Sequence, residues 1–307
     1  MHILVIGSSN TDLVVRTENL PKPGETLLGG TFFVNPGGKG ANQAVASARL
    51  GDNVTFCCMT GQDDYGRAAR ELFRGEGIDT NYVFSTPDSA SGIALITVDA
   101  KGENSIVVAS GANSKLTPED IDRIGDFGTY DIVLCQLEIP LETVCHAARR
   151  VKLSGGRFVL NPAPACRLPE SLLSDVDILT PNETEAELLS GVHITDRHSA
   201  VRAAEALSEK GVSIVIITLG SKGVLVYREG KPEFLPAFKV EAVDTTAAGD
   251  VFNGALCVAL AEGKELQEAI CFAQAASAIA VTRAGAQQSA PTRVDVENLL
   301  NQKTLNL

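Results

Sequence analysis

The segment ILVIGSSNTD (residues 3–12) joins an unbroken apolar run to a polar turn. Four apolar residues without alternation are typical of a strand that is buried on both faces, as in a parallel sheet. Ligands of open α/β sheets bind at the carboxyl ends of such strands, which is where Asn10 and Asp12 lie. The segment therefore predicts a parallel strand followed by side chains that could hold hydroxyl groups, although an ordinary polar turn has the same pattern.

The rest of the chain alternates strand-like runs with helical patterns, which predicts an α/β fold with a mostly parallel sheet covered by helices. Two stretches, at about 12–34 and 91–111, instead show period-2 patterns, and the second turns at residues 99–102. We expect these two stretches to form a small separate sheet that projects from the main one. Strands are predicted at 3–6, 54–59, 132–135, 158–160, 178–179 and 213–219, and helices at 40–50, 65–75, 141–152, 182–189, 199–210, 250–262, 265–282 and 294–301.

Composition excludes several classes of protein. The chain has 307 residues, of which 44% are hydrophobic, so it can bury a sizeable core and is not intrinsically disordered. Its net charge of −12 argues against binding to nucleic acid or to anionic membranes. No apolar run approaches the roughly 18 residues of a membrane helix. Seven scattered cysteines without a CxxC pair predict reduced thiols and a cytoplasmic location.

The strongest chemical signal is VDTTAAGDVFNG (residues 243–254). Small residues lead into an apolar helix that carries Asp250 in its first turn. Free N–H groups and the helix dipole make an anion site there, and a carboxylate beside that site could take a proton from a hydroxyl. A structural alternative makes Asp250 a favourable N-terminal charge and Asp244 a loop cap, but two Asp residues that frame TTAAG favour a functional site.

A second cluster is NPGGKGANQ (residues 35–43). It is not a Walker A loop, because Phe33 stands where that pattern requires Gly, and it lacks the GxGxxG of dinucleotide-binding proteins. What remains is a glycine turn before a helix, with N–H groups, one cation and two amides that could bind a polyol or a phosphate.

Three further polar segments follow predicted strands. QLE (136–138) lies at one strand end. The acidic TPNETE (180–185) could organise the water shell of Mg²⁺ or merely cap a helix. The glycine turn TLGSKG (218–223) could shape a nucleotide pocket or be only a tight turn.

Together and in this order, these motifs resemble the ribokinase-like (PfkB) family of carbohydrate kinases. The matching patterns run nearly from end to end: GSxNxD, GGKGANQ, QLE, TPNExE, TLGSKG and DTxAAGD. The resemblance implies one Rossmann-like three-layer sandwich over residues 1–307, with a small β-sheet lid through which homodimers often form. It also implies ATP-dependent phosphorylation of D-ribose at O5.

The resemblance assigns roles by motif. Asp250 would be the general base, and the N–H groups of Ala247, Ala248 and Gly249 would form an anion hole. The sugar would be bound by Asp250 and by Asn10, Asp12, Gly38, Lys39, Asn42 and Glu138. Asn182 and Glu185 would serve the phosphates and Mg²⁺, and Thr218, Gly220, Gly223 and Gln274 would line the nucleotide site. A monovalent cation, typically K⁺, would be held by Asp244, Thr246, Val281, Ala284, Ala286 and Ser289.

Other functions stay open on the sequence alone. A kinase of deoxyribose, a ketohexose or a nucleoside could share all of these motifs. A sugar or nucleotide sensor without catalytic activity would keep the fold, although the intact Asp250 turn argues against it. A Rossmann dehydrogenase is disfavoured because the chain has no GxGxxG.

Overall fold

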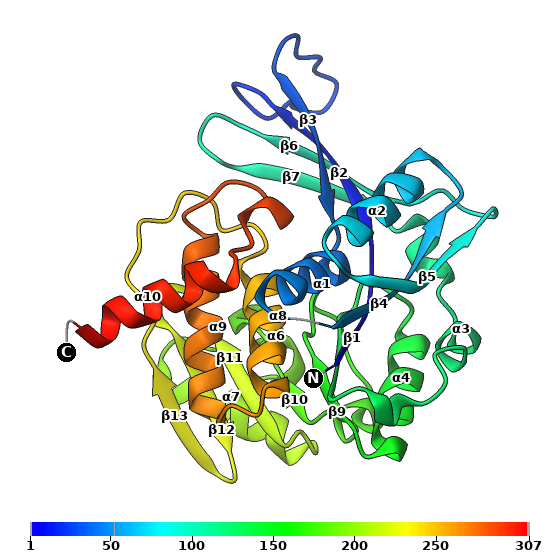
Figure 1. The fold of residues 1–307 in the computed structure, drawn as a ribbon. Coiled ribbons are helices and arrows are strands. Elements are labelled where there is room, and N and C mark those ends of the chain that lie inside the picture. Colours follow the sequence, from blue (N-terminus) through cyan, green and yellow to red (C-terminus); the bar gives the residue numbers. More distant parts are fainter. Residues whose placement is uncertain (1, 52, 306–307) are drawn as a thin grey trace.

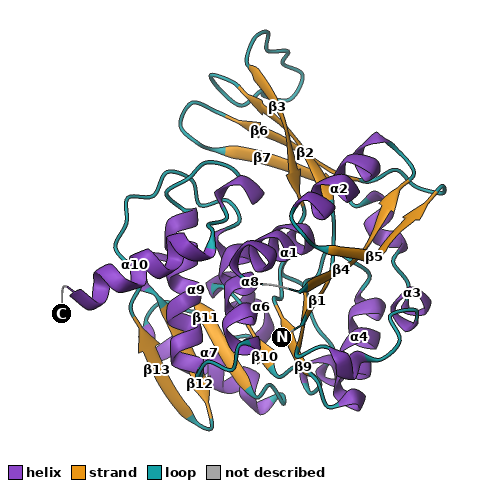
Figure 2. Ribbon diagram, in the orientation of Figure 1, coloured by secondary structure: helices purple, strands orange, loops and turns teal. Residues whose placement is uncertain are grey.

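In a computed structural model, residues 2–51 and 53–305 are described, and their main feature is a nine-stranded sheet (Figures 1 and 2). The strand order is β13-β12-β11-β10-β9-β8-β1-β4-β5. All neighbours from β11 to β5 pair in parallel, and the hairpin β12–β13 is antiparallel. The strands are β1 (Ile3–Ile6), β4 (Val54–Gly61), β5 (Asp79–Thr86), β8 (Ile132–Cys135), β9 (Arg157–Leu160), β10 (Ile178–Leu179), β11 (Ile214–Thr218), β12 (Val224–Arg228) and β13 (Lys231–Leu235).

Helices cover both faces of this sheet, which confirms the predicted three-layer α/β fold (Figure 2). Along β1, Ile3 and Val5 pack into one core, and Leu4 and Ile6 into the other. The first core is closed by α1 (Lys39–Leu50), α2 (Asp64–Gly75), α8 (Ala248–Ala261), α9 (Leu266–Ala280) and α10 (Arg293–Leu305). The second is closed by α3 (Pro118–Asp122), α4 (Leu141–Ser154), α5 (Glu170–Leu173), α6 (Glu183–Ser190) and α7 (Arg197–Glu209). Burial on both sides explains why these strands are apolar without alternation.

The predicted small sheet is present and projects from the main sheet (Figure 1). Its strands are β3 (Thr31–Gly37), β2 (Asn10–Arg16), β6 (Gly92–Val98) and β7 (Asn104–Ala109), in that order. The expected turn at residues 99–102 joins β6 to β7. The first two strands reach further toward the main sheet than predicted, because Asn10 pairs with Gly37 at their root. The lid therefore begins within the glycine-rich and Asn-Asp motifs themselves.

Three strands were not predicted. β5, with the sequence DTNYVFST, is an edge strand of the main sheet, and β12 and β13 form a hairpin at the other edge. Edge strands need no unbroken apolar run, since solvent reaches one side of them. The pattern of β5 therefore lacks the signal that identifies the central strands.

The contact between α1 and α8 depends on Gly254. A Cβ at Gly254 would lie 2.8 Å from the Gln43 carbonyl oxygen and 2.9 Å from the Cβ of Ala46. These distances leave no room for a side chain at the point where the two helices cross. The close approach brings the first turn of α1 against the first turn of α8.

We predict that Gly254→Ala lowers the free energy of unfolding by about 1–3 kcal/mol, because a methyl group would force the two helices apart. Gly75→Ala in α2 is the matched control, since a Cβ there meets nothing within 4 Å. That change should leave stability unchanged or raise it by up to about 1 kcal/mol. Urea unfolding measures both, and equal effects of the two substitutions would contradict the packing argument.

Candidate active site

The polar motifs meet at one edge of the main sheet, where β1, β8, β9 and β10 end. The carboxyl ends of parallel strands share an edge, so segments that lie far apart in the sequence become neighbours. Hydrogen bonds from the α1 side chains Asn42 and Gln43 to Asp250 join the first turns of α1 and α8 at this edge. The structure thus brings together the motifs that the sequence analysis singled out.

Asp250 lies at the centre of the site, 6% exposed, in the first turn of α8 as predicted. Its Oδ2 accepts a hydrogen bond from the Asn42 side-chain amide at 2.9 Å, and its Oδ1 accepts one from the Gln43 amide at 2.9 Å. Burial raises the pKa of Asp250, although Lys39 and the two amides oppose that rise. A carboxylate whose pKa is raised is a better proton acceptor than an exposed one.

The turn before α8 exposes backbone rather than side chains. Ala247 is the N-cap and adopts a left-handed conformation, with φ of 58°. The first N–H groups of a helix have no partner within the helix. Of the described N–H groups of Ala247, Ala248 and Gly249, only that of Ala248 donates to a backbone carbonyl, that of Thr245 at 3.3 Å. Gly249 is exposed, and Ala247 and Ala248 are half-buried. A phosphoryl oxygen could therefore reach these donors.

Two sugar-site candidates lie on β2. Asn10 and Asp12 are two residues apart on one strand, so their side chains face the same side of the lid. The Asn10 side-chain oxygen accepts a 2.6 Å hydrogen bond from Asn113. Burial, with Glu138 and Asp250 nearby, raises the pKa of Asp12 to about 6. Asp12 thus faces the same space as the proposed base.

Glu138 and Lys39 complete this side of the site. Glu138 Oε2 accepts a hydrogen bond from the Ser8 hydroxyl at 2.5 Å and one from the Lys39 N–H at 3.0 Å. Gly38 precedes α1 with φ of 89°, a conformation that favours glycine. Burial lowers the pKa of the Lys39 ammonium, but Asp250, Glu138 and Glu185 outweigh that effect, so the pKa is raised. Lys39 therefore stays charged among carboxylates.

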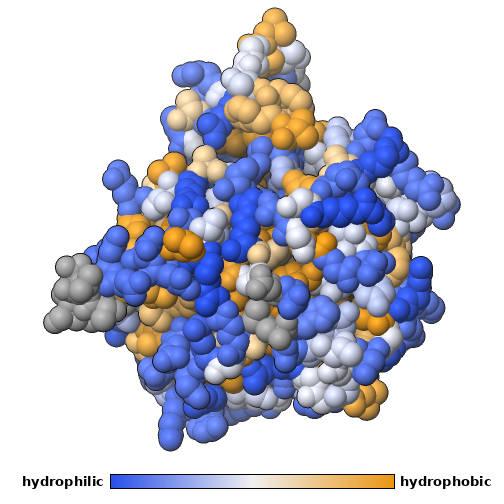
Figure 3. Space-filling view, viewed as in Figure 1, coloured by the Kyte–Doolittle hydropathy of each residue, from blue (hydrophilic) through white to orange (hydrophobic). Residues whose placement is uncertain are grey.

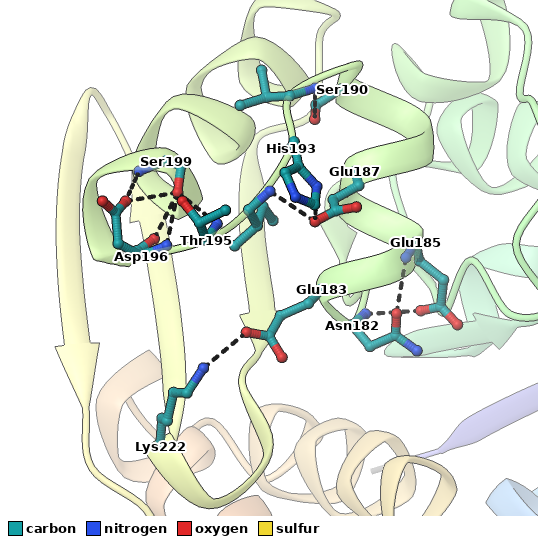
Figure 4. Close-up of polar contacts among 12 residues, drawn as sticks. Asn182, Glu183, Glu185, Glu187, Ser190, His193, Thr195, Asp196, Ser199 and Lys222 are labelled. Carbon is teal, nitrogen blue, oxygen red and sulfur yellow. Dashed lines mark hydrogen bonds and ion pairs between the residues drawn. The ribbon is translucent and has the colours of Figure 1, made fainter.

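Asn182 and Glu185 form a reciprocal cap at the start of α6 (Figure 4). The Glu185 N–H donates to Asn182 Oδ1 at 2.8 Å, and the Asn182 N–H donates to Glu185 Oε2 at 2.8 Å. The alternative that residues 180–185 cap a helix is therefore confirmed. Glu185 also interacts electrostatically with Lys39 and Asp250, so it faces the catalytic centre as well.

The glycine turn of residues 218–223 lies beside this cap. Thr218 donates its N–H to the Pro181 carbonyl at 2.9 Å and bridges to Asn182. Figure 4 shows Lys222 reaching Glu183 of α6, at 3.3 Å. The cap and the turn therefore form one continuous surface.

Gly220, Gly223 and Gln274 extend the same surface toward α9. Gly220 opens the turn with φ of 56°, and the backbone at Gly223 packs against the Leu235 carbonyl. Gln274 of α9 donates to that same carbonyl at 3.3 Å. The structure thus places Gln274 beside the turn of residues 218–223.

The candidate cation ligands lie on two loops that are bonded to each other. Asp244 accepts hydrogen bonds from the Thr246 N–H and the Gly285 N–H, both at 2.9 Å. The Val281 carbonyl accepts from Val243 at 2.7 Å and from Asp244 at 3.1 Å. The six candidates, Asp244, Thr246, Val281, Ala284, Ala286 and Ser289, share this loop pair. Carboxylate and carbonyl oxygens suit a hard cation, whereas the described residues contain no group of three or more His, Cys, Asp or Glu side chains that could hold a metal ion.

A buried chain of amides beneath the site was not predicted as such. Gln136 donates to Gln43 at 2.6 Å, Gln43 to Asn161 at 3.0 Å, and Asn161 to the Thr180 carbonyl at 3.1 Å. The Thr180 hydroxyl then donates to Asn253, which donates to the Gly249 carbonyl. Asn161 directly follows β9, so the rule of strand ends would have found it. Asn253 and the lid-root residue Asn113 carry no such signal.

Comparisons with known proteins support a sugar kinase. A family model described as pfkB family carbohydrate kinase matches residues 1–293. The chain is 49% identical over 299 residues to a ribokinase of Haemophilus influenzae, covering 97% of this chain and 98% of that protein. It is 41% identical over 295 residues to a deoxyribokinase of Salmonella typhi, covering 95% and 96%. A structure of Arabidopsis thaliana ribokinase complexed with ribose and ATP superposes with a TM-score of 0.90, at 35% identity and 97% and 98% coverage.

We predict that Asp12→Asn raises the thermal midpoint at pH 8. A raised pKa means that the folded state binds the Asp12 proton more tightly than the unfolded state does, so the ionised carboxylate costs stability above about pH 6. The gain should shrink as the pH falls through about 6 and vanish below about 4. Thermal unfolding between pH 4 and 8 measures it.

Asp63→Asn is a control of opposite sign. Burial raises the pKa of Asp63, but hydrogen bonds from Ser91 and Gly66 outweigh that effect and hold the pKa below its usual value. Replacement of the Asp63 carboxylate should therefore destabilise the protein at pH 8. A pH-independent change in the Asp12 variant would contradict the electrostatic account.

Proposed function

Since the chain belongs to the pfkB family of carbohydrate kinases, we propose that it transfers the γ-phosphoryl group of ATP to O5 of D-ribose. The products are ribose 5-phosphate and ADP. One observation carries the proposal: a buried carboxylate, Asp250, lies in the same helical turn as the backbone N–H groups of Ala247 to Gly249. A proton acceptor and an anion site are thereby adjacent, as transfer to a hydroxyl requires. The ribokinases of high identity and the relative complexed with ribose and ATP support these substrates.

The chain's own residues account for the chemistry. Asp250 accepts the proton of the sugar hydroxyl as its oxygen attacks the γ-phosphorus atom. The N–H groups of Ala247, Ala248 and Gly249 stabilise the charge that develops on the transferred group. Asn10, Asp12 and Asn42, with Gly38, Lys39 and Glu138, orient the sugar so that its hydroxyl points at Asp250. Positioning and charge stabilisation supply most of the rate enhancement in such transfers.

Cations complete this proposal. Asn182 and Glu185 would serve the phosphates and the water shell of Mg²⁺, beside a nucleotide held along Thr218, Gly220, Gly223 and Gln274. The loops of Asp244, Thr246, Val281, Ala284, Ala286 and Ser289 would hold K⁺ or a similar monovalent cation. These ions would supply positive charge beside the phosphates, in addition to Lys39 and the backbone N–H groups.

We also propose that the lid forms a homodimer. Apolar side chains stand exposed on the small sheet, and Figure 3 shows hydrophobic surface gathered over it. They are Phe32, Val34, Leu95, Ile106, Val107 and Val108, each between 49% and 64% exposed. A cluster of this kind on a sheet of four strands is typical of a protein interface. A second copy of the lid presents the same apolar surface, so the two surfaces would cover each other.

The proposed location is the cytoplasm. All seven cysteines are free thiols in the structure, as suits a reducing compartment. Among residues 2–51 and 53–305, no helix has the length and apolar character to cross a bilayer.

We predict that Asp250→Asn keeps the fold but lowers kcat by at least ~10²-fold, because an amide cannot accept the hydroxyl proton. Asp177→Asn is the control: Asp177 accepts a 2.7 Å hydrogen bond from the Phe158 N–H at the opposite edge of the sheet and should keep kcat. A coupled assay for ADP with circular dichroism measures both. Near-normal turnover by the Asp250 variant would refute the assignment of the base.

A sugar panel tests the substrate, because a deoxyribokinase is among the similar proteins. We predict that kcat/KM for D-ribose exceeds that for 2-deoxy-D-ribose by at least ~10-fold, since a site built to bond a hydroxyl rejects an analogue that lacks it. Fructose and adenosine are larger than ribose and should be poorer substrates for that reason. Activity on deoxyribose alone would favour the deoxyribokinase alternative. Binding of ribose without turnover would favour a sensor.

Replacing K⁺ by Na⁺ in the same panel should lower kcat, and an Asp244→Asn variant should lose that difference.

A further inference from the structure

Gln43 is a fully buried residue whose side chain is saturated with hydrogen bonds. Its amide nitrogen donates to Asp250 Oδ1 at 2.9 Å and to Asn161 Oδ1 at 3.0 Å, and its oxygen accepts from Gln136 at 2.6 Å. Its exposed fraction is 0%. A side chain in this position cannot touch a substrate, so its effect on the reaction must pass through Asp250.

The neighbouring residue Asn42 behaves differently. Asn42 is 8% exposed, it donates to the other oxygen of Asp250, and its own Oδ1 is buried without a hydrogen-bond partner. An unpartnered buried oxygen is costly, and a ligand hydroxyl can satisfy it. Two side-chain amides donate to Asp250. A sugar hydroxyl can bond to that of Asn42, whereas that of Gln43 is held by hydrogen bonds with Asp250, Asn161 and Gln136.

We propose that Gln43 is the positioning residue of the general base: it fixes Asp250 through Oδ1, so that the second lone pair of Oδ2, beside the bond from Asn42, is directed at the hydroxyl proton. The inference rests on the proposed function, because it requires Asp250 to be the base. The anchor of Gln43 is the amide chain of Gln136 and Asn161, which lies at the ends of β8 and β9. The ends of two sheet strands, β8 and β9, together with helix α1 thereby set the orientation of one carboxylate.

The charged groups that face Asp250 are Lys39 of α1, Asp12 of β2, Glu138 after β8 and Glu185 of α6. Lys39 favours the ionised carboxylate, and the three acids disfavour it. The bond from Gln43 also favours the ionised form, because an N–H donor stabilises a carboxylate more than a neutral acid. Loss of that bond should therefore raise the pKa of Asp250.

The test compares Gln43→Met with Gln136→Met. Both substitutions replace a fully buried amide by an apolar side chain of similar length, and both break the bond between residues 43 and 136, but only Gln43→Met breaks the bond to Asp250. We expect Gln43→Met to lower kcat by ~10- to 10²-fold and to move the acidic limb of the kcat–pH profile upward by ~0.5–1 unit, with KM for ATP nearly unchanged. Gln136→Met removes one anchor of Gln43 but leaves its bonds to Asp250 and Asn161 in place, so it should move the limb by less than ~0.3 unit.

A second background separates positioning from general support of the fold. If Gln43 acts through Asp250, then adding Gln43→Met to Asp250→Ala should change the residual kcat by less than ~2-fold. A structural role would lower the residual rate by the same factor as in the wild type. If Gln43→Met fails to fold, Gln43→Asn keeps an amide in the core but is one methylene too short to reach Asp250, and the same shifts are expected.

The outcomes distinguish the two levels of inference. Equal pH profiles for the variants of Gln43 and Gln136, or a full multiplicative loss in the Asp250→Ala background, would overturn the role of Gln43 alone. An active Asp250→Ala enzyme would overturn the proposed base, whereas a wild-type protein that does not phosphorylate ribose would overturn the proposed function. Circular dichroism and thermal midpoints confirm that each variant is folded.

Discussion

The site depends on the burial of one carboxylate. An ionised Asp is costly to bury unless donors replace the water that it loses, and Asp250 finds its two donors on a single helix, α1. Those donors reach it only because α1 and α8 cross closely at Gly254. The packing of two helices and the chemistry of the base are thus a single constraint. Separation of the helices would cost stability and leave the carboxylate without donors.

The same constraint explains how a protein with a net charge of −12 can handle phosphates. Glu138, Glu185 and Asp250 face the half-buried ammonium of Lys39, and Asp12 lies close to Asp250 as well. A site with this excess of acids repels free phosphate. In the proposed function, binding of ATP therefore draws on backbone N–H groups, the α8 dipole and recruited cations. Overall acidity argues against polymeric nucleic acid as a partner without arguing against a nucleotide.

Sequence patterns predicted those parts of the structure that carry strong local signals. The central strands are unbroken apolar runs because both faces are buried, and the ligand-facing residues directly follow them. The edge strands β5 and β13 escaped because solvent reaches one of their sides, whereas β12 was missed although its residues are apolar and mostly buried like those of the central strands. The buried amides escaped for another reason: the pairing of Gln43 with Asp250 spans 207 positions, and nothing in the local sequence of either residue encodes it. Only the crossing of α1 and α8 creates that pair.

The lid and the sugar site share residues, so neither can move independently. Asn10 is the first residue of β2 and a sugar-site candidate, and Asn113, just after β7, bonds its side chain. Asn113 also holds the Ser9 backbone through donor and acceptor bonds of 3.2 and 2.9 Å. A Cβ at Gly92, where β6 begins, would collide with the same Asn10 side chain. Strands of both lid insertions therefore start or end against one polar side chain. A ligand hydroxyl that reoriented Asn10 would act on β2, β6 and β7 together, which links occupancy of the site to the position of the lid.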